Sequence, residues 1–377
     1  MSDLVISGGD VLTAEGTVER VDVVCDGPTI GALTGTAGVG TIDATDALVL
    51  PGIIDVHGDA FERALMPRPG VFLGADRALD ETRPQLLAAG ITTAFISVTD
   101  SWEPGLRCRE QLRGIIDEVT DPEQRRRPPR LEIHVRHETC NTDDIDELLD
   151  WVADGTVAML SYGDHTPGGI AMVKGVGAGR VQRADVAQAE LEALQDEAIE
   201  RRALGREQER LLAAAAHEAG IPTACHDPSS LEDLERDLAL DVRFAEFPVS
   251  IQLARRYREH DLPVLLGAPN LARGGSHCGN LAVSDAWLAG AADLLCSDYH
   301  YASLLNAPFV LLDLGATLAE AWATVAATPA RVAGLDDRGT IAPEQTADLA
   351  VVEPPADGRG ARVRAVVVDG ELAYYAG

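Results

Sequence analysis

The sequence predicts an α/β protein with a (β/α)8 barrel of the TIM type and a small β-sandwich domain built from both termini. Eight short apolar segments rich in β-branched residues alternate with helical stretches, which is the pattern of a parallel α/β sheet. The segment that contains them, residues 50–335, has about the length of such a barrel, roughly 250 residues. The chain has 377 residues, which leaves room for a second, smaller domain.

The predicted barrel strands are short and are separated by stretches with helical composition. The longest of these stretches, 184–219, is rich in Ala, Glu, Arg and Leu. Gly205 is its expected break, so we predict two helices that cover the barrel. The eight predicted strands are 48–56, 92–98, 131–135, 157–162, 222–225, 244–247, 263–266 and 293–296.

Further short strands with turn residues between them flank the barrel on both sides. They are LVISGGDVLT and RVDVVCDGPTIGAL before it, and DLAVVEPP and RVRAVVVDGELAYY after it. We predict that residues 1–49 and 336–377 together form the small domain and that residues 50–335 form the barrel.

The charge of the chain excludes one class of partner. Lys and Arg number 31 against 61 Asp and Glu, a net charge of -30 that repels DNA, RNA and anionic lipid. The hydrophobic content of 46% is ordinary for a globular protein, so the acidity is a surface property and does not indicate disorder. Lys174 is the only lysine, and arginine bias with acidity is typical of a halophilic protein; an acidic protein from ordinary salt is the alternative.

Cysteine spacing and hydropathy give expectations about location. The six cysteines form no CxxC pair, so neither a zinc ribbon nor a disulfide framework is indicated. The start of the chain lacks a basic segment followed by an apolar run, and no apolar stretch approaches the roughly 20 residues that span a bilayer. We expect a cytoplasmic protein with reduced thiols and no membrane partner.

Imidazole and carboxylate groups follow several of the predicted strands. In PGIIDVHGD the first strand ends in His57 and Asp59, which the period of two places on one face. The third strand, LEIHVRHE, ends in Glu138, a carboxylate that can bridge two metal ions. Catalytic groups of barrel enzymes lie at such carboxyl ends. His165, His226 and Asp298 follow three further strands.

This mixture of nitrogen and oxygen ligands without cysteine predicts a divalent metal site. One or two zinc ions are the first expectation, with manganese, iron and nickel left open. A divalent ion lowers the pKa of water and polarises a carbonyl or phosphoryl oxygen, so hydrolysis is the expected reaction class. A single such group could be an ordinary satisfied polar residue, and His137, on the opposite face from Glu138, is expected to be structural.

A glycine-rich segment after the seventh strand, LLGAPNLARGGSHCGN, is a candidate phosphate site. Its glycines allow close backbone approach, and Arg273, Ser276 and His277 can donate hydrogen bonds to phosphate oxygens. Barrel enzymes often bind phosphate after strands seven and eight. Arg63 and Arg68 in FERALMPRPG offer further cationic contacts. The alternatives are a tight structural turn for the loop and surface salt bridges for the two arginines.

These segments together resemble the amidohydrolase superfamily and, within it, the family of alpha-D-ribose 1-methylphosphonate 5-triphosphate diphosphatases of the carbon-phosphorus lyase pathway. The resemblance covers most of the chain, and the long GAPN and MPRPG segments are far more specific than the short HxH-like patterns. The matching motifs are PGIIDVHGDAFERALMPRPGV, DHTPG, the HD of CHDP, AEFP, GAPNLARGGSHCGN and SDYHYASLL.

The resemblance implies a metal-dependent barrel that hydrolyses a small phosphorylated sugar, the ribosyl triphosphate, to 5-phospho-alpha-D-ribose 1-methylphosphonate and diphosphate. It also implies that Asp298 acts as the general base. By motif position it implies phosphate contacts from Arg273, Ser276 and His277 and metal ligation by His57, Asp59, Glu138, His165, His226 and Asp298.

Two features depart from the superfamily pattern. The superfamily commonly bridges its metals with a carbamylated lysine on the fourth strand, whereas this chain has only Lys174, so Glu138 on the predicted third strand is the better bridge. After DHTPG the chain reads GIAMVKGVGAGR, where the family has polar, aromatic and basic residues. Hydrolysis of a cyclic amide, deamination of a small heterocycle and a metal-free interaction scaffold are the alternatives, and a homo-oligomer is left open.

Overall fold

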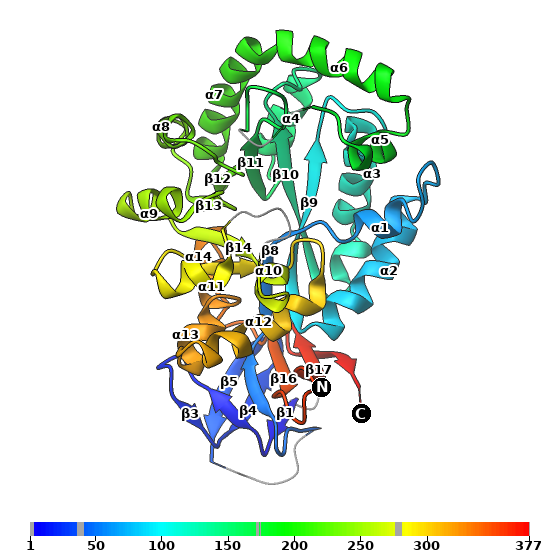
Figure 1. Ribbon diagram of the computed structural model, residues 1–377. Coiled ribbons are helices and arrows are strands. Elements are labelled where there is room, and N and C mark those ends of the chain that lie inside the picture. The colour runs from blue at the N-terminus through cyan, green and yellow to red at the C-terminus, as the bar shows by residue number, and fades with distance from the viewer. Residues whose placement is uncertain (1–3, 36–40, 171–172, 174, 276–280, 377) are drawn as a thin grey trace.

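The computed structural model describes residues 4–35, 41–170, 173, 175–275 and 281–376. Its central element is an eight-stranded parallel sheet in which strands adjacent along the chain are also neighbours in the sheet (Figure 1). The strands are β8 (Ile53–Gly58), β9 (Ile91–Asp100), β10 (Arg130–Glu138), β11 (Met159–Gly163), β12 (Thr223–His226), β13 (Phe244–Glu246), β14 (Val264–Gly267) and β15 (Leu294–Cys296).

The two edge strands of this sheet, β8 and β15, meet at their carboxyl ends. Gly58 and Asp298 form a parallel bridge. The backbone N–H of Asp298 donates to the carbonyl of His57, and that of Asp59 donates to the carbonyl of Asp298, both at 3.0 Å. The sheet is therefore a nearly closed TIM-type barrel, which confirms the predicted fold class, and each of the eight predicted strand segments overlaps one barrel strand.

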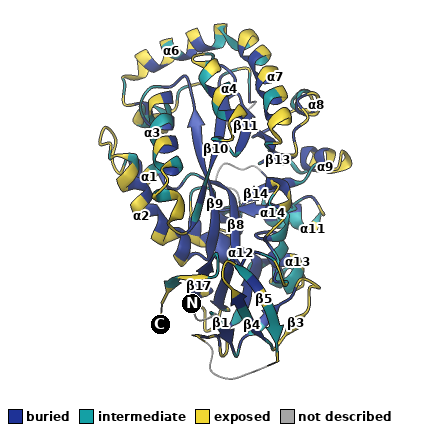
Figure 2. Cartoon of the chain, turned by 180° about the vertical axis from the view of Figure 1, so that it is seen from behind, coloured by how far each residue is buried: buried dark blue, intermediate teal, exposed yellow. Residues whose placement is uncertain are grey.

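Helices follow each barrel strand and cover the outside of the sheet, with buried inner faces and exposed outer faces (Figure 2). None of the helices in the described ranges is both long and apolar enough to cross a membrane. The α-helices are α1 (Glu62–Leu65), α2 (Ala75–Ala88), α3 (Arg109–Thr120), α4 (Ile145–Ala153), α5 (Ala178–Ala184), α6 (Gln188–Glu200), α7 (Arg202–Ala219), α8 (Leu231–Ala239), α9 (Ile251–Glu259), α10 (Ala268–Ala272), α11 (Val283–Leu288), α12 (Tyr301–Asp313), α13 (Leu318–Ala323) and α14 (Ala327–Ala333); the 3-10 helices are η1 (Gly105–Arg107) and η2 (Gln124–Arg126).

The long helical stretch ends and restarts at a different place from the predicted one. The break lies at Arg201, between α6 and α7, and Gly205 is buried inside α7. A Cβ at Gly205 would lie 1.7 Å from the carbonyl oxygen of Thr139, which directly follows β10. The prediction of a break at Gly205 was wrong because this glycine serves close packing of α7 against the end of a barrel strand.

Two smaller sheets are built from the chain termini, and the ends of the chain lie together below the barrel (Figure 1). Their inner faces share a buried cluster that includes Ile6 and Val23 from one sheet and Val49 and Val351 from the other. The first sheet contains β5 (Thr29–Thr34), β4 (Asp22–Asp26), β1 (Val5–Ser7) and β6 (Ile42–Asp43), and the second contains β18 (Glu371–Tyr375), β17 (Arg362–Val368), β16 (Leu349–Glu353), β7 (Leu48–Pro51), β2 (Asp10–Leu12) and β3 (Val18–Glu19).

The predicted strand 48–56 is two strands with different partners. β7 pairs with β16 in a terminal sheet, whereas β8 belongs to the barrel. Gly52 separates them, and a Cβ there would lie 2.3 Å from the hydroxyl oxygen of Thr92. A continuous apolar run thus connects the two parts of the molecule. The boundaries 49/50 and 335/336 between the two domains stay our proposal.

The base of the barrel is joined to the terminal sheets through one buried arginine. Arg338 donates from Nη1 to the carboxylate of Asp348 at 2.9 Å and to the Thr93 hydroxyl, in β9, at 3.2 Å. Its Nε and Nη2 each lie 2.9 Å from a carboxylate oxygen of Asp337. All three guanidinium nitrogens therefore have partners within this network.

A candidate metal-dependent active site at the barrel mouth

The barrel strands bring the predicted ligand residues to one end of the barrel, which we call the mouth. Below it, the barrel interior is filled by apolar side chains such as Phe95, Met159 and Phe244. Val56 faces this interior cluster and its neighbour His57 also contacts the interior carboxylate of Glu246. The register shift of β8 between Asp55 and Gly58 breaks the strand alternation there and re-aims His57.

Glu246, at the end of β13, holds two imidazoles side by side. Its Oε1 lies 2.9 Å from Nδ1 of His57 and its Oε2 lies 2.9 Å from Nδ1 of His226. The two rings are stacked, with centroids 5.1 Å apart and planes 9° apart. Arg136 Nη1 lies 3.3 Å from Nε2 of His57 and donates to it, so Nε2 carries the lone pair. Glu246 thus orients both imidazoles in the way that outer carboxylates orient metal-ligating histidines.

The charge of Glu246 is retained although it is fully buried. Burial raises the pKa of this carboxyl, but electrostatic interaction with the imidazoles of His57 and His134 and the hydrogen bonds from His226 and His57 outweigh burial and hold the pKa well below its usual range. Glu246 was absent from the predicted ligands. The AEFP segment that ends the sixth barrel strand contains it, and that position was the available signal.

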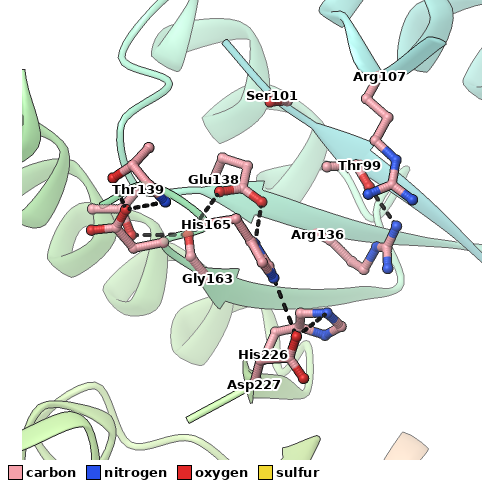
Figure 3. Close-up of polar contacts among 12 residues, drawn as sticks. Thr99, Ser101, Arg107, Arg136, Glu138, Thr139, Gly163, His165, His226 and Asp227 are labelled. Atoms are coloured by element: carbon pink, nitrogen blue, oxygen red, sulfur yellow. Dashed lines mark hydrogen bonds and ion pairs between the residues drawn. The ribbon is translucent and has the colours of Figure 1, made fainter. Parts of the chain in front are cut away.

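A second group joins the ends of β10, β11 and β12. His165 lies between two carboxylates: its Nδ1 is 2.5 Å from Glu138 Oε1, and its Nε2 is 3.3 Å from Asp227 Oδ2 (Figure 3). The backbone N–H of His165 also donates to Glu138, at 3.0 Å. Asp227 was absent from the predicted ligands, although it follows His226 directly in CHDP.

Glu138 and His165 hold one another in their charged forms. Burial opposes the ionised carboxylate, but His165 overcomes it and lowers the pKa of Glu138 to about 2. Burial also opposes the charged imidazole, but Glu138 raises the pKa of His165 to about 9. Glu138 ends the third barrel strand, so the strand count made from the sequence is correct.

Asp59 and Asp298 lie where the barrel closes, and their pKa values move in opposite directions. Burial opposes ionisation of Asp59, but Arg136, 3.3 Å away, and Arg107, 3.7 Å away, lower its pKa. Burial and the negative charge of Asp59 raise the pKa of Asp298 to about 7. Paired carboxyl groups with separated pKa values are an arrangement suited to acid–base work.

The donor atoms at the mouth fit a divalent metal. Two groups of three have ligand atoms within 4.8 Å of one another, and His226 belongs to both, so the groups adjoin. Imidazole nitrogens and carboxylate oxygens without thiolate suit the divalent ions expected from the sequence. The first group is His57, His226 and Glu246, and the second is His165, His226 and Asp227.

A cavity of about 30 Å³ lies among these groups, about the room that one water molecule occupies. It is lined on one side by Glu138, His165 and His226 and on the other by Arg107 and Arg136. Figure 3 shows the two guanidinium groups on the β9 side of the His165 ring. The mouth therefore combines potential metal ligands with fixed positive charge.

The predicted phosphate-binding residues are placed only in part. Arg63 in α1, Arg68 after it and Arg273 at the end of α10 are exposed. None of the three side chains makes a hydrogen bond or ion pair with another described residue, so the alternative of surface salt bridges for Arg63 and Arg68 finds no support within that part of the chain. Ser276 and His277 lie outside the described residues, as does Lys174.

His137 lies on the outer side of β10, as expected for a structural residue. Its Nδ1 is 2.8 Å from Asp100, which also receives two hydrogen bonds from Arg109 at 2.6 and 2.7 Å and one from Asn141 at 2.9 Å. These contacts fix the end of β9 against the start of α3.

Similarity to known proteins was found in sequence and in structure, while no protein-family profile matches the chain. The chain is 31% identical over 321 residues to the alpha-D-ribose 1-methylphosphonate 5-triphosphate diphosphatase of Escherichia coli (strain K12), an alignment that covers 82% of this chain and 84% of that protein.

Solved structures with similar folds include a dipeptidase, a prolidase and a triazine hydrolase variant. A Xaa-Pro dipeptidase with bound methionine has a TM-score of 0.67 at 16% identity, with 100% of both chains covered. A prolidase complexed with N-methylphosphonate-L-proline has a TM-score of 0.64 at 17% identity, covering 98% of this chain and 99% of that one. A triazine hydrolase variant has a TM-score of 0.64 at 16% identity, covering 99% and 95%.

The structural matches establish the fold, and the sequence match establishes the family. The sequence match to a diphosphatase over 82% of the chain shows a hydrolase, in place of the alternative of an interaction scaffold without enzymatic activity. This hydrolase belongs to the family of alpha-D-ribose 1-methylphosphonate 5-triphosphate diphosphatases.

Proposed function

We propose that this enzyme hydrolyses alpha-D-ribose 1-methylphosphonate 5-triphosphate to 5-phospho-alpha-D-ribose 1-methylphosphonate and diphosphate, in phosphonate degradation. The observation that carries the substrate is the 31% identity with the diphosphatase of Escherichia coli. The mouth supports the reaction class, because it joins a set of imidazole and carboxylate donors to an ionisable carboxyl with a pKa of about 7.

The proposed cofactor is one or two divalent metal ions, with zinc as the first choice and manganese, iron or nickel as alternatives. When bound, such an ion supplies Lewis acidity that polarises a phosphoryl oxygen and lowers the pKa of water. Glu138 is the proposed bridging carboxylate. By motif position the proposed ligands are His57, Asp59, Glu138, His165, His226 and Asp298. The three histidines of this set belong to the two groups of donor atoms at the mouth, and Asp227, in the second group, is a further proposed donor.

The chain's own residues divide the remaining work. Asp298 is the proposed general base that accepts a proton from water. The water oxygen forms a bond to the α-phosphorus, the bond from that phosphorus to the oxygen bridging to the β-phosphorus breaks, and diphosphate leaves. Cleavage lies between the α and β positions because one phosphate stays on the sugar. Arg63, Arg68, Arg273, Ser276 and His277 are the proposed contacts to the substrate's phosphate groups.

A polyanionic substrate is compatible with a net charge of -30. Net charge governs the far field, which salt screens within about 3 Å at 1 M ionic strength. At the mouth the proposed metal ions and Arg273 would set the local sign, and the guanidinium groups of Arg107 and Arg136 line the cavity beside the proposed metal ligands. We propose that the enzyme works in a salt-rich cytoplasm, with a small phosphorylated sugar and neither nucleic acid nor membrane as its partner.

The test uses purified, metal-loaded protein in high salt with the ribosyl triphosphate. We expect equal amounts of diphosphate and 5-phospho-alpha-D-ribose 1-methylphosphonate, measured by phosphorus NMR. Stepwise release of orthophosphate without diphosphate would contradict the proposal. Release of ammonia or a new carboxylate from a panel of heterocycles and cyclic amides, with the triphosphate left intact, would favour the alternative activity.

A further inference from the structure

A second group of arginines borders the mouth, apart from the proposed phosphate contacts. We call Arg107, Arg180 and Arg183 the α5 arginine cluster. Arg107 ends η1, the turn after β9, while Arg180 and Arg183 belong to α5, which follows β11. Two loops that are distant in sequence thus bring three guanidinium groups to the same side of the barrel.

Close packing of α5 on η1 creates this cluster. Gly105 has a φ of 76°, and a Cβ at this position would lie 2.4 Å from the carbonyl oxygen of Arg183. Only glycine combines this backbone conformation with such close approach at no cost. The loop after β8 also contacts the carboxyl end of α5, since a Cβ at Gly70 would lie 3.1 Å from the carboxylate of Asp185, the residue that follows this helix.

Arg180 is fixed beside the proposed metal ligands. Its Nη1 donates to the backbone carbonyl of His165 at 2.7 Å, and its Nε donates to Glu103. The guanidinium carbon lies over the ring of Trp102, 5.2 Å from the ring centroid. An arginine fork held on three sides is preorganised to bind an anion.

Arg107 is held in a similar way and reaches the cavity itself. Its Nε and Nη2 donate to the two oxygens of Glu62 at 2.8 and 2.9 Å. The same side chain lines the cavity together with Glu138 and His165 (Figure 3). The cluster therefore begins at the proposed reaction centre and extends outward along α5.

Arg183 differs from the other two members of the cluster in its contacts. It makes no hydrogen bond or ion pair within the described part of the chain, and its Nε is buried without a partner. Burial and the nearby charge of Arg107 lower its pKa. Arg107 pairs with Glu62 and Asp59, and Arg180 pairs with Glu103, whereas Arg183 forms no ion pair among the described residues. A buried donor without a partner is costly, and an anionic ligand removes that cost.

Arg273, one of the proposed phosphate contacts, lies on the opposite side of the barrel mouth. The α5 arginine cluster comes from the segments after β9 and β11, the two strands that flank β10. Three strands separate β10 from β14 in each direction around the barrel, so Arg273, after β14, lies across the mouth from this cluster. The proposed substrate also has two anionic ends, a methylphosphonate and a triphosphate. The triphosphate carries more negative charge than the methylphosphonate, so it is the better match for the α5 arginine cluster with its three guanidinium groups.

We propose that Arg107, Arg180 and Arg183 bind the β- and γ-phosphates of the substrate and hold diphosphate as it leaves. The ligand class is an anion with two or more linked phosphates. This inference rests on the proposed function for the identity of the substrate, but diphosphate binding is measurable without turnover.

The experiment compares anion binding by the metal-loaded wild type and by Arg183→Gln, using isothermal titration calorimetry with diphosphate, orthophosphate and methylphosphonate. Arg183→Gln removes one charge without breaking an ion pair among the described residues. We expect the Kd for diphosphate to rise on the order of tenfold, since charge-assisted hydrogen bonds are the strong ones. The Kd values for orthophosphate and methylphosphonate should change less than twofold.

Arg126→Gln is the matched control. Arg126 is an exposed arginine of η2, which precedes the amino end of β10 and is thus at the far end of the barrel. This substitution changes the net charge of the protein by the same amount as Arg183→Gln, and it should leave all three Kd values unchanged. Gly105→Ala, which displaces α5 from η1, should weaken diphosphate binding in the same direction as Arg183→Gln.

The outcomes separate this inference from the proposed function. An unchanged Kd for diphosphate in Arg183→Gln, equal weakening of diphosphate and orthophosphate, or selective weakening of methylphosphonate would each overturn the inference. If the wild type binds diphosphate through Arg183 but releases none from the ribosyl triphosphate, the proposed substrate is wrong and the subsite stands. If turnover is as proposed and Arg183→Gln binds diphosphate normally, only the subsite fails.

Discussion

The two ends of the barrel both contain buried arginines, but the arginines are neutralised differently. At the base, Arg338 donates from all three of its guanidinium nitrogens to Asp337, Asp348 and Thr93. At the mouth, Arg183 has no partner among the described residues, and Arg136 donates to a proposed metal ligand, His57. A closed network stabilises the fold, whereas an open one leaves donors for a ligand.

The buried carboxyl groups at the two ends of the barrel also differ in the charge of their neighbours. Burial raises the pKa of Asp348 at the base to about 6, although Arg338 counteracts it. Burial and a second carboxylate raise the pKa of Asp298 at the mouth to about 7. The pKa of Asp348 is raised although its partner cation, Arg338, lies beside it, whereas the pKa of Asp298 is raised partly because another carboxylate, Asp59, lies beside it. Substitutions at the base should therefore change stability, and substitutions at the mouth should change binding and turnover.

The largest effect is expected for Asp298→Asn. Loss of the proposed general base should lower kcat by about 10²- to 10⁴-fold, because an amide cannot accept the proton from water. Diphosphate release measures the effect, and the urea midpoint should stay within error of the wild type. A variant that keeps a tenth of the wild-type kcat would show that Asp298 is not the base and would weaken the contrast between the two ends.

Arg338→Met should show the reverse behaviour. It leaves the buried Asp348 carboxylate without its cation, and breaking a buried pair costs about 3–5 kcal/mol in the free energy of unfolding. Chemical denaturation measures the loss, and kcat per folded molecule should equal that of the wild type. A large fall in kcat with normal stability would show that Arg338 acts in turnover and would contradict the contrast between the two ends of the barrel.

The stability loss in Arg338→Met should depend on pH. The folded-state pKa of Asp348 is about 6, above its ordinary value of 3.8, so the folded protein binds this proton more tightly than the unfolded chain. Below pH 6 the carboxyl is neutral and no longer needs Arg338. We expect a smaller loss at pH 5 than at pH 7.5, and an equal loss at both would exclude Asp348 as the affected partner.

Glu246→Gln tests the orienting carboxylate of the mouth. The amide cannot accept hydrogen bonds from both His57 and His226 as a carboxylate does, and loss of such outer partners typically weakens metal affinity by about 10- to 100-fold. Metal retained after dialysis against a graded chelator gives the measurement. Glu232→Gln, at an exposed position in α8, is the control with the same change of charge. Equal metal affinity in both variants would show that Glu246 does not contribute to metal binding.

The sequence predicts the barrel and the strand-end ligands because both depend on local signals. Apolar strands with turn residues mark the eight barrel positions, and a polar residue directly after such a strand, as with His226, must lie at the mouth. Glu246 was missed because a single carboxylate in a short segment carries no local sign of its two imidazole partners. Arg183 was missed because its position depends on α5 packing against Gly105, which is far away in the chain.

The smallest effect is expected for Arg273→Ala, on the side of the mouth opposite the α5 arginine cluster. Arg273 is exposed, and exposed charges contribute little because water and salt screen them, typically below 1 kcal/mol. We expect KM for the ribosyl triphosphate to rise only about two- to fivefold in low salt and less in high salt, with metal content unchanged. Arg183→Gln, in the same assay, should raise KM more and lose less of its effect in salt, because its guanidinium is partly buried. Loss of metal from Arg273→Ala, or a larger KM effect than that of Arg183→Gln at high salt, would show that burial does not separate the two sides of the mouth.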